Sequence, residues 1–147
     1  CYGTPPPWLE LVPPDERAAR VLANADQALV DGARFFLRGH LEIPLVDRGE
    51  TFAWSVWVEL DRESFEHADA RWEDPARAGD RYSGVLAAAL PYEPSTRGLP
   101  CVLTSRELGV VPLVQVSPAE HPLAVEQARG MTLLRVQELA HLLLHRS

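Results

Sequence analysis

The clearest pattern in the chain is an alternation of apolar and polar residues between positions 27 and 60. A period of two is typical of β-strands, because successive side chains point to opposite faces of a sheet. The pattern predicts strands at residues 27–30, 34–43 and 52–60. Asp31-Gly32 separates the first two and favours a β-hairpin, since this dipeptide tolerates the positive φ of a tight turn. Pro44 is expected to end the second strand, because it cannot donate a ladder hydrogen bond.

The two longer predicted strands each have one apolar face and one mixed face. The apolar faces consist of Phe35, Leu37, Leu41 and Ile43 in one strand and of Phe52, Trp54, Val56, Val58 and Leu60 in the other. The mixed faces consist of Phe36, Arg38, His40 and Glu42 and of Ala53, Ser55, Trp57 and Glu59. If the strands pair, the mixed faces form one polar surface that contains a tryptophan.

Helix caps and apolar stripes predict the remaining elements. Helices are expected at 14–23, at 62–74 after the N-cap Asp61, within 121–130, and at 133–145 after the cap Thr132. The segment 82–90 can be a strand or a helix by its period, and Gly84 and Pro91 favour an extended structure. Further strands are expected at 99–108 and 110–117, joined around Gly109. The sum is a single α+β domain over residues 1–147, with an antiparallel sheet of about five strands, helices packed on one side and a C-terminal amphipathic helix. Residues 1–13 form a Pro-rich extended opening segment.

Composition narrows the class of protein. A formal net charge of −7 disfavours nucleic acid and anionic membranes as general partners. No apolar run approaches the roughly 20 residues that span a bilayer, and the first residues lack the pattern of a signal peptide, so we expect none. Two cysteines make no disulfide framework, which agrees with a cytoplasmic location. The first residue is Cys1 rather than Met, so we expect a segment upstream to be missing.

The polar surface of the two long strands is the first candidate site. Arg38, His40 and Glu42 share a face, and Trp57 and Glu59 join them if the strands are neighbours. An arginine can hold a carboxylate or phosphate with two hydrogen bonds, and a glutamate can hold a cation. The alternative is a solvated sheet face with cross-strand ion pairs. A large aromatic residue on a polar face often marks a binding surface or a covered sheet face.

Histidines provide two further candidates. His121 and Glu126 can form a pair for proton transfer, or His121 can simply cap a helix. His141 and His145 lie one helical turn apart and form a weak candidate for a metal site, but the helix dipole alone favours histidine in a last turn. Cys101 alternates with Leu99 and Leu103 and is expected in the core. No phosphate-binding, dinucleotide-binding, serine-elbow or zinc-protease motif is present, so we expect no cofactor.

Three runs, "FFLRGHLEIP", "FAWSVWVEL" and "HPLAVEQARGMTLLRVQELAHLLLH", together resemble the bacterial family of domain of unknown function 2199. The similarity covers nearly the whole chain, from Tyr2 to His145. Fuller members of that family begin with a C-x-x-C segment that looks like half of a zinc knuckle. That segment is absent from these 147 residues. The resemblance implies a bacterial cytoplasmic protein and assigns no activity.

The sequence therefore favours a non-catalytic binding module that recognises a protein or a small polar ligand through the polar and aromatic sheet face. The acidic charge, the tryptophan on the polar face and the lack of a catalytic motif support this hypothesis. The alternative is a small hydrolase that uses a His–carboxylate pair, with His40 or His121 and Glu42, Glu59 or Glu126.

Overall fold

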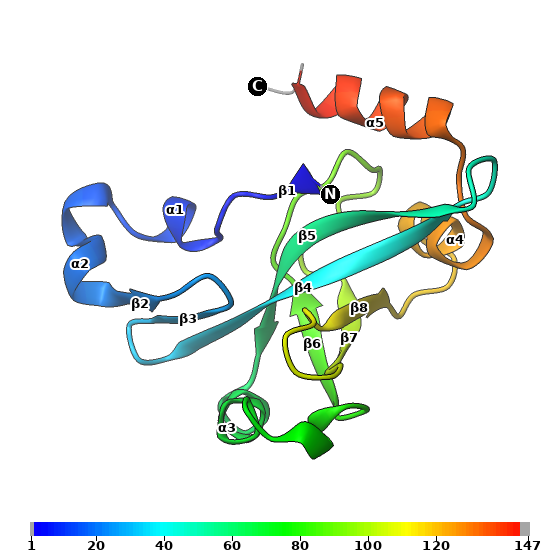
Figure 1. The fold of residues 1–147 in the computed structure, drawn as a ribbon. Coiled ribbons are helices and arrows are strands. Elements are labelled where there is room, and N and C mark those ends of the chain that lie inside the picture. The colour runs from blue at the N-terminus through cyan, green and yellow to red at the C-terminus, as the bar shows by residue number, and fades with distance from the viewer. Residues whose placement is uncertain (1, 145–147) are drawn as a thin grey trace.

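The computed structural model describes residues 2–144, except for the side chains of Tyr2 and Glu10. Its strands are β1 (Tyr2–Gly3), β2 (Val21–Ala23), β3 (Gln27–Val30), β4 (Arg34–Leu45), β5 (Glu50–Leu60), β6 (Arg81–Leu86), β7 (Pro100–Thr104) and β8 (Leu113–Val116). Its helices are α1 (Trp8–Leu11), α2 (Arg17–Arg20), α3 (Arg62–Ala70), α4 (Pro122–Arg129) and α5 (Leu133–Leu144), with 3-10 turns at Pro14–Glu16 and Pro75–Arg77. The chain is α+β, as the sequence predicts (Figure 1).

Five consecutive strands, β4 to β8, close into a barrel. Each pairs antiparallel with the next, so β8 runs in the same direction as β4 and the closing pair is parallel, at His40↔Leu113. β1 joins β5 in parallel, and β3 and β2 extend the sheet from β4. The prediction of a purely antiparallel sheet with helices on one side is therefore corrected. The helices lie at different places around the barrel (Figure 1), because a closed sheet has no single outer side to cover.

The hairpin of β4 and β5 organises the whole sheet, because each of these long strands pairs with two other strands along its outer edge. The first part of β4 pairs with β3, and its middle pairs with β8. The middle of β5 pairs with β1, and its last part pairs with β6. The expected turn at Asp31-Gly32 is present, with φ values of 56° and 64° at these two residues.

Pro44 does not end β4, which continues to Leu45. The backbone N–H groups of Arg38 and His40 donate to Asp26 and Pro112, away from β5. Residues alternate along a strand, so the nitrogen of Pro44 lies on the same outer side as these two. The missing N–H therefore costs no hydrogen bond to β5, which is why a proline is tolerated here.

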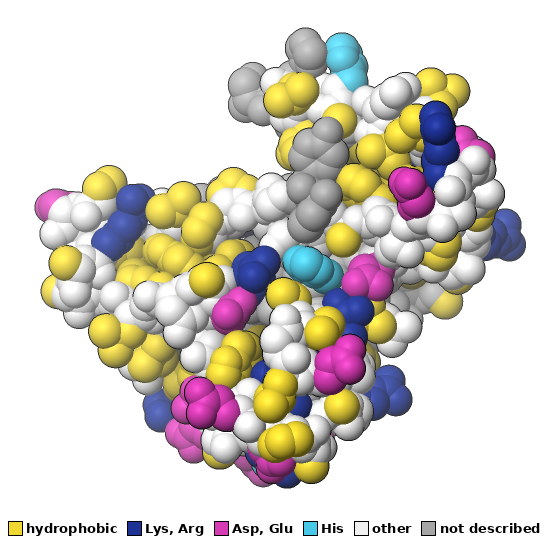
Figure 2. All heavy atoms as spheres, in the orientation of Figure 1, with side chains coloured by type: hydrophobic (Ala, Val, Ile, Leu, Met, Phe, Trp, Pro, Cys, Tyr) yellow, Lys and Arg dark blue, Asp and Glu magenta, His cyan; other side chains and the backbone are white. Residues whose placement is uncertain are grey.

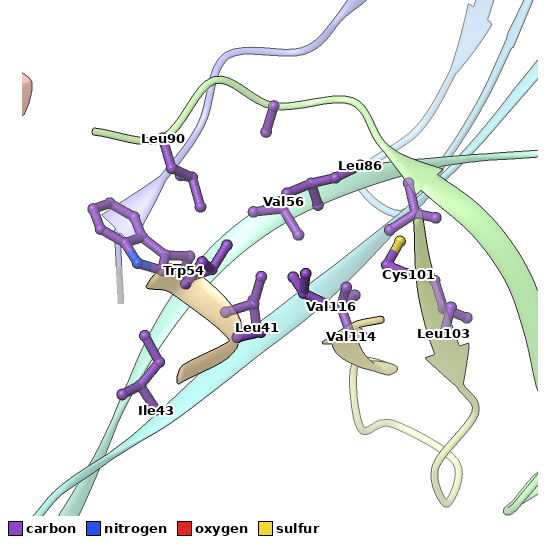
Figure 3. Packing of buried hydrophobic residues seen from close by; sticks show 14 of the residues in the cluster. Leu41, Ile43, Trp54, Val56, Leu86, Leu90, Cys101, Leu103, Val114 and Val116 are labelled. Atoms are coloured by element: carbon purple, nitrogen blue, oxygen red, sulfur yellow. The ribbon is translucent and has the colours of Figure 1, made fainter. Parts of the chain in front are cut away.

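The barrel interior holds the main hydrophobic core. Figure 3 shows side chains from all sides of the barrel meeting in one cluster, with Leu41 from β4, Trp54 and Val56 from β5, Leu103 from β7 and Val114 from β8. Trp54, Leu41 and Leu103 have no exposed surface. Cys101 is in the core as predicted, and burial raises the pKa of its thiol to about 12, so the sulfur stays protonated and inert.

A second, smaller core lies on the outer face of the sheet, under the N-terminal segment. Phe36 of β4 and Trp57 of β5 are 0% and 5% exposed and pack with Val12. Trp8 of α1 meets the Trp57 ring edge to face, with 5.0 Å between ring centroids. Of the two readings that the sequence leaves open for Trp57, a binding surface and a covered sheet face, the structure shows the covered face. Residues 2–12 form β1 and α1 rather than a plain extended segment, and they cover this part of the sheet.

The other boundaries differ in detail from the sequence prediction. The helix expected at 14–23 ends at Arg20, and β2 follows it. The helix after Asp61 ends at Ala70, and the strands expected at 82–90, 99–108 and 110–117 are shorter, as β6, β7 and β8. The caps are as predicted: Asp61 accepts a hydrogen bond from the N–H of Ser64, and Thr132 accepts one from that of Arg135. The C-terminal amphipathic helix is α5, which buries Val136 and Leu139.

Gln127 of α4 completes the edge of β8. Its side-chain oxygen accepts a hydrogen bond from the N–H of Val116 at 2.9 Å, and its side-chain nitrogen donates to the carbonyl of Val114 at 2.9 Å. β4 and β8 pair only at His40↔Leu113, so these backbone groups lie beyond the strand pairing. The amide side chain takes the place of a neighbouring strand.

Replacing Gln127 with leucine is expected to lower the free energy of unfolding by about 1–3 kcal/mol, because two backbone groups of β8 lose their partners. Urea denaturation followed by circular dichroism measures the change. Gln115 lies exposed on the same strand, and Gln115→Leu is the matched control with an expected change within about 0.5 kcal/mol. Equal losses in both variants would show that Gln127 does not support the edge.

Candidate functional site

A row of four charged side chains and one histidine lies along the line where β4 meets β8. It contains Asp26 of the β2–β3 turn, Arg38, His40 and Glu42 of β4, and Arg106 of the loop before β8. We call these five residues the charged row. In Figure 2, basic and acidic side chains lie on both sides of a histidine in the middle of the face shown. Arg38, His40 and Glu42 are thus brought together as the sequence predicts.

Arg38 is held in one position by three neighbours. Its Nε donates to the carbonyl of Ala25 at 2.8 Å, one Nη donates to Ser55 Oγ at 3.0 Å, and the other donates to Asp26 Oδ1 at 3.0 Å. The side chain therefore ties the β2–β3 turn to the barrel, and its guanidinium group has a fixed orientation.

Arg106 is held in a similar way on the other side of the row. Its Nε donates to the carbonyl of Val111 at 2.7 Å, and its Nη1 lies 2.9 Å from Glu42 Oε2. The first contact closes the loop before β8, and the second joins this loop to β4. Both side chains of this ion pair are about one-third exposed to solvent, so the pair adds little to the free energy of unfolding. Its main effect is to fix the orientation of the two side chains.

His40 occupies the centre of the row. Its backbone N–H donates to the carbonyl of Pro112 at 2.8 Å, and it lies opposite Ser55 on β5. Burial lowers the pKa of the imidazole, and the positive charges of Arg38 and Arg106 lower this pKa further. Glu42 acts in the opposite direction with a smaller effect. The imidazole is therefore neutral at pH 7 and lies in a positive local potential.

Two hollows adjoin the ends of the charged row. The first, of about 420 Å³, is lined by Asp26, Trp72, Arg77 and the loop 108–112. The second, of about 380 Å³, is lined by Glu42, Thr51, Gln115 and residues of α4. Pro112 lines the first hollow and Leu113 the second, and these consecutive residues are the ones that contact the backbone of His40. We call the charged row with its two hollows the β4–β8 seam.

Trp57 and Glu59, the other predicted members of the polar face, are not part of the seam. Trp57 lies beneath Trp8 in the second core. Glu59 forms an ion pair with Arg34, with hydrogen bonds of 2.7 and 2.9 Å. This pair matches the solvated cross-strand ion pair that the sequence leaves open as the alternative.

His121 and Glu126 have separate partners. His121 caps α4: its Nδ1 accepts a hydrogen bond from the N–H of Leu123 at 3.1 Å, and its Nε2 donates to the carbonyl of Pro94 at 2.8 Å. Glu126 pairs with Arg135 of α5 at 2.9 Å. Both imidazole nitrogens of His121 are engaged with backbone groups, so this position offers no His–carboxylate pair for hydrolysis.

The histidines of the last helix give no metal site that can be described. His141 is exposed near the end of α5, and His145 lies outside the described residues. Within residues 2–144, no three His, Cys, Asp or Glu side chains are arranged to hold a metal ion. In the same part of the chain, no helix has the length and apolar character needed to cross a membrane.

Sequence reasoning missed Asp26 and Arg106. Both are in loops, where no periodicity indicates which way a side chain points. The one signal for Arg106 is its position directly after a predicted strand and before Gly109, which marks a turn near a sheet edge.

The fold and site together define a small closed β-barrel protein with a charged surface seam. The chain belongs to the family described as "Uncharacterized protein conserved in bacteria (DUF2199)", whose model matches residues 2–131. This confirms the resemblance seen in the sequence, and the match includes every residue of the charged row. Comparison with curated proteins and with solved structures gave no significant match.

Proposed function

We propose that this protein is a non-catalytic binding module that recognises a polar ligand through the β4–β8 seam. The observation that carries the proposal is the position of the charged row between two hollows. Binding sites combine a concave surface with a few polar groups that fix the orientation of the ligand. The seam has both features, and the ligand is either a small molecule or an extended polar segment of another protein.

The fixed side chains of the seam also support binding. Arg38 and Arg106 are oriented by backbone carbonyls and carboxylates before any ligand arrives. A pre-oriented side chain loses little conformational entropy on binding, and this loss is one of the main costs of association. The proposal moves the recognition surface away from Trp57, because that residue contributes to the second core instead.

The test is a search for ligands by NMR on the ¹⁵N-labelled protein. Fractions of a bacterial metabolite extract are added, and shifts of the backbone amides are mapped on the structure. We expect the shifted amides to cluster at residues 38–42, 105–115 and 26. Clustering elsewhere, or no shifts with any fraction, contradicts the proposal.

A variant with a blocked seam provides a sharper comparison. Gln115 lines the second hollow and is exposed, so Gln115→Glu adds a negative charge there without disturbing the core. It is expected to weaken binding of the active fraction at least about fivefold. Glu66→Gln, on the exposed face of α3, is the control with unchanged affinity. Equal affinities of both variants would mean that the second hollow is not used.

A further inference from the structure

The two arginines of the charged row both place positive charge near His40, and the two carboxylates lie at the two ends of the row. Arg38 is joined to Asp26, which lines the first hollow, and Arg106 is joined to Glu42, which lines the second. We infer that the seam binds an anionic group of its ligand, a carboxylate or a phosphate, beside His40 and between the guanidinium groups of Arg38 and Arg106. This inference rests on the proposed binding function and specifies the chemistry of the ligand.

Both guanidinium groups have hydrogen-bond donors left for such a group. Within the described residues, the Arg38 guanidinium donates to Ala25, Ser55 and Asp26, and the Arg106 guanidinium donates to Val111 and pairs with Glu42. A guanidinium carries more N–H groups than these contacts use. Hydrogen bonds from arginine to a carboxylate or phosphate are among the strongest in proteins, because both partners are charged.

The charges around His40 also favour the binding of an anion. Arg38 and Glu42 flank His40 on its own strand, Ser55 lies opposite it on β5, and Arg106 is joined to Glu42 from the loop. The positive charge of the N-terminal amine also acts on the imidazole, with a smaller effect than either arginine. The two arginines lower the pKa of His40 more than Glu42 raises it. The local potential is therefore positive on a chain with a formal net charge of −7, so this surface differs in sign from the molecule as a whole.

Anion binding and protonation of His40 must strengthen each other. An anion beside the imidazole stabilises its charged form and raises the pKa of His40. By linkage, the affinity for an anion whose own charge stays constant rises as the pH falls from 7.5 to 5.5, because protonated His40 adds a third positive charge. Without a ligand, protonation of His40 is unfavourable in the folded state, so the same fall in pH lowers the stability of the free protein.

Titration with simple anions tests the inference. Inorganic phosphate and acetate are added separately to the full chain, with sodium chloride at matched ionic strength as the reference. The imidazole signals are followed by NMR, and His67, which is hydrogen-bonded to Tyr82 beside α3, is the internal control. We expect a saturable shift at His40 with at least one of the two anions. The affinity for acetate, which stays mostly ionised at both pH values, is expected to be higher at pH 5.5 than at pH 7.5, whereas phosphate loses a negative charge in this range and is compared with acetate at pH 7.5. The response to phosphate or to acetate tells which anionic group the seam prefers.

Two substitutions that are expected to change the affinity for the anion in opposite directions make the test specific. Arg106→Gln removes a positive charge and is expected to weaken binding of the preferred anion about tenfold. Glu42→Gln removes a negative charge and is expected to strengthen it. Unfolding temperatures and amide spectra verify that both variants are folded. Neither substitution touches the cores, since both residues lie at the surface of the seam.

Three results would overturn the inference: no saturable shift at His40, a shift equal to that in chloride, or weaker binding by Glu42→Gln. If neither anion binds but the metabolite extract still shifts the amides of the seam, the anion inference fails and the proposed binding function stands. If the extract also shifts none of these amides, both fail.

Discussion

Trp57→Ala is expected to lower the free energy of unfolding by about 3–5 kcal/mol, the usual cost of deleting a buried tryptophan. The indole is 5% exposed and fills the space between Phe36, Val12 and the ring of Trp8. Removing it leaves a cavity on the outer face of the sheet, and it also removes the surface on which the N-terminal segment rests. A loss of this size is a large part of the total stability of a domain, so the urea midpoint falls clearly.

Two further variants test whether the loss of stability in Trp57→Ala comes from lost packing. Trp57→Phe keeps an aromatic ring against Trp8 and is expected to cost less than half as much as the alanine variant. Trp8→Ala removes the other member of the ring pair, but Trp8 is only partly buried, so its cost is expected to be smaller. A surface recognition residue would behave differently. If Trp57→Ala changes the unfolding free energy by less than about 1 kcal/mol, the second core does not exist as described.

The position of Trp57 in the structure shows what the alternation of apolar and polar residues along a strand can establish. The period of two correctly assigns Trp54 and Trp57 to opposite faces of β5. It says nothing about which part of a face is covered by a segment from elsewhere. Trp57 is buried because residues 2–12 cross the outer face, whereas His40, farther along the same face, remains only half-buried.

Features that depend on neighbours in the sequence were predictable. The turn at Asp31-Gly32, the strand 27–30 and the cap at Asp61 each follow from a few adjacent residues, and the structure confirms them. Closure of the barrel depends instead on a pairing between His40 and Leu113, which are far apart in the chain. No local pattern specifies such a partner, so the sequence predicts the strands but not their arrangement.

The same distinction applies to the seam. Arg38, His40 and Glu42 share a face of one strand, and the period of two is sufficient to group them. Asp26 and Arg106 reach the same surface from two loops, and only the fold brings them there. The hollows at the two ends also arise from tertiary packing, because the segment after α3, with Trp72 and Arg77, borders the first and α4 borders the second.

Gly84→Ala is the second substitution with a large expected effect, because it acts where β6 crosses β5. A Cβ atom at Gly84 would lie 2.6 Å from the carbonyl oxygen of Glu59 and 2.8 Å from side-chain atoms of Val58 and Leu60. The carbonyl belongs to a strand that is paired on both sides, at Val58↔Leu86 with β6 and at Leu37↔Val58 with β4. It cannot move without separating strands of the barrel, so we expect a loss of about 1–3 kcal/mol or more.

Gly3→Ala is the matched control, since Gly3 also lies in a strand beside β5, at Gly3↔Ser55, but a Cβ there meets no atom of the described residues within 4 Å. Both glycines have ordinary backbone angles, so the two variants differ in the space available and not in conformational strain. Gly3→Ala is expected to change the unfolding free energy by less than about 0.5 kcal/mol, measured by urea denaturation. If the two substitutions cost the same, the strands do not approach closely at Gly84. A loss confined to Gly84→Ala means that the barrel requires a residue without a side chain where β5 and β6 cross.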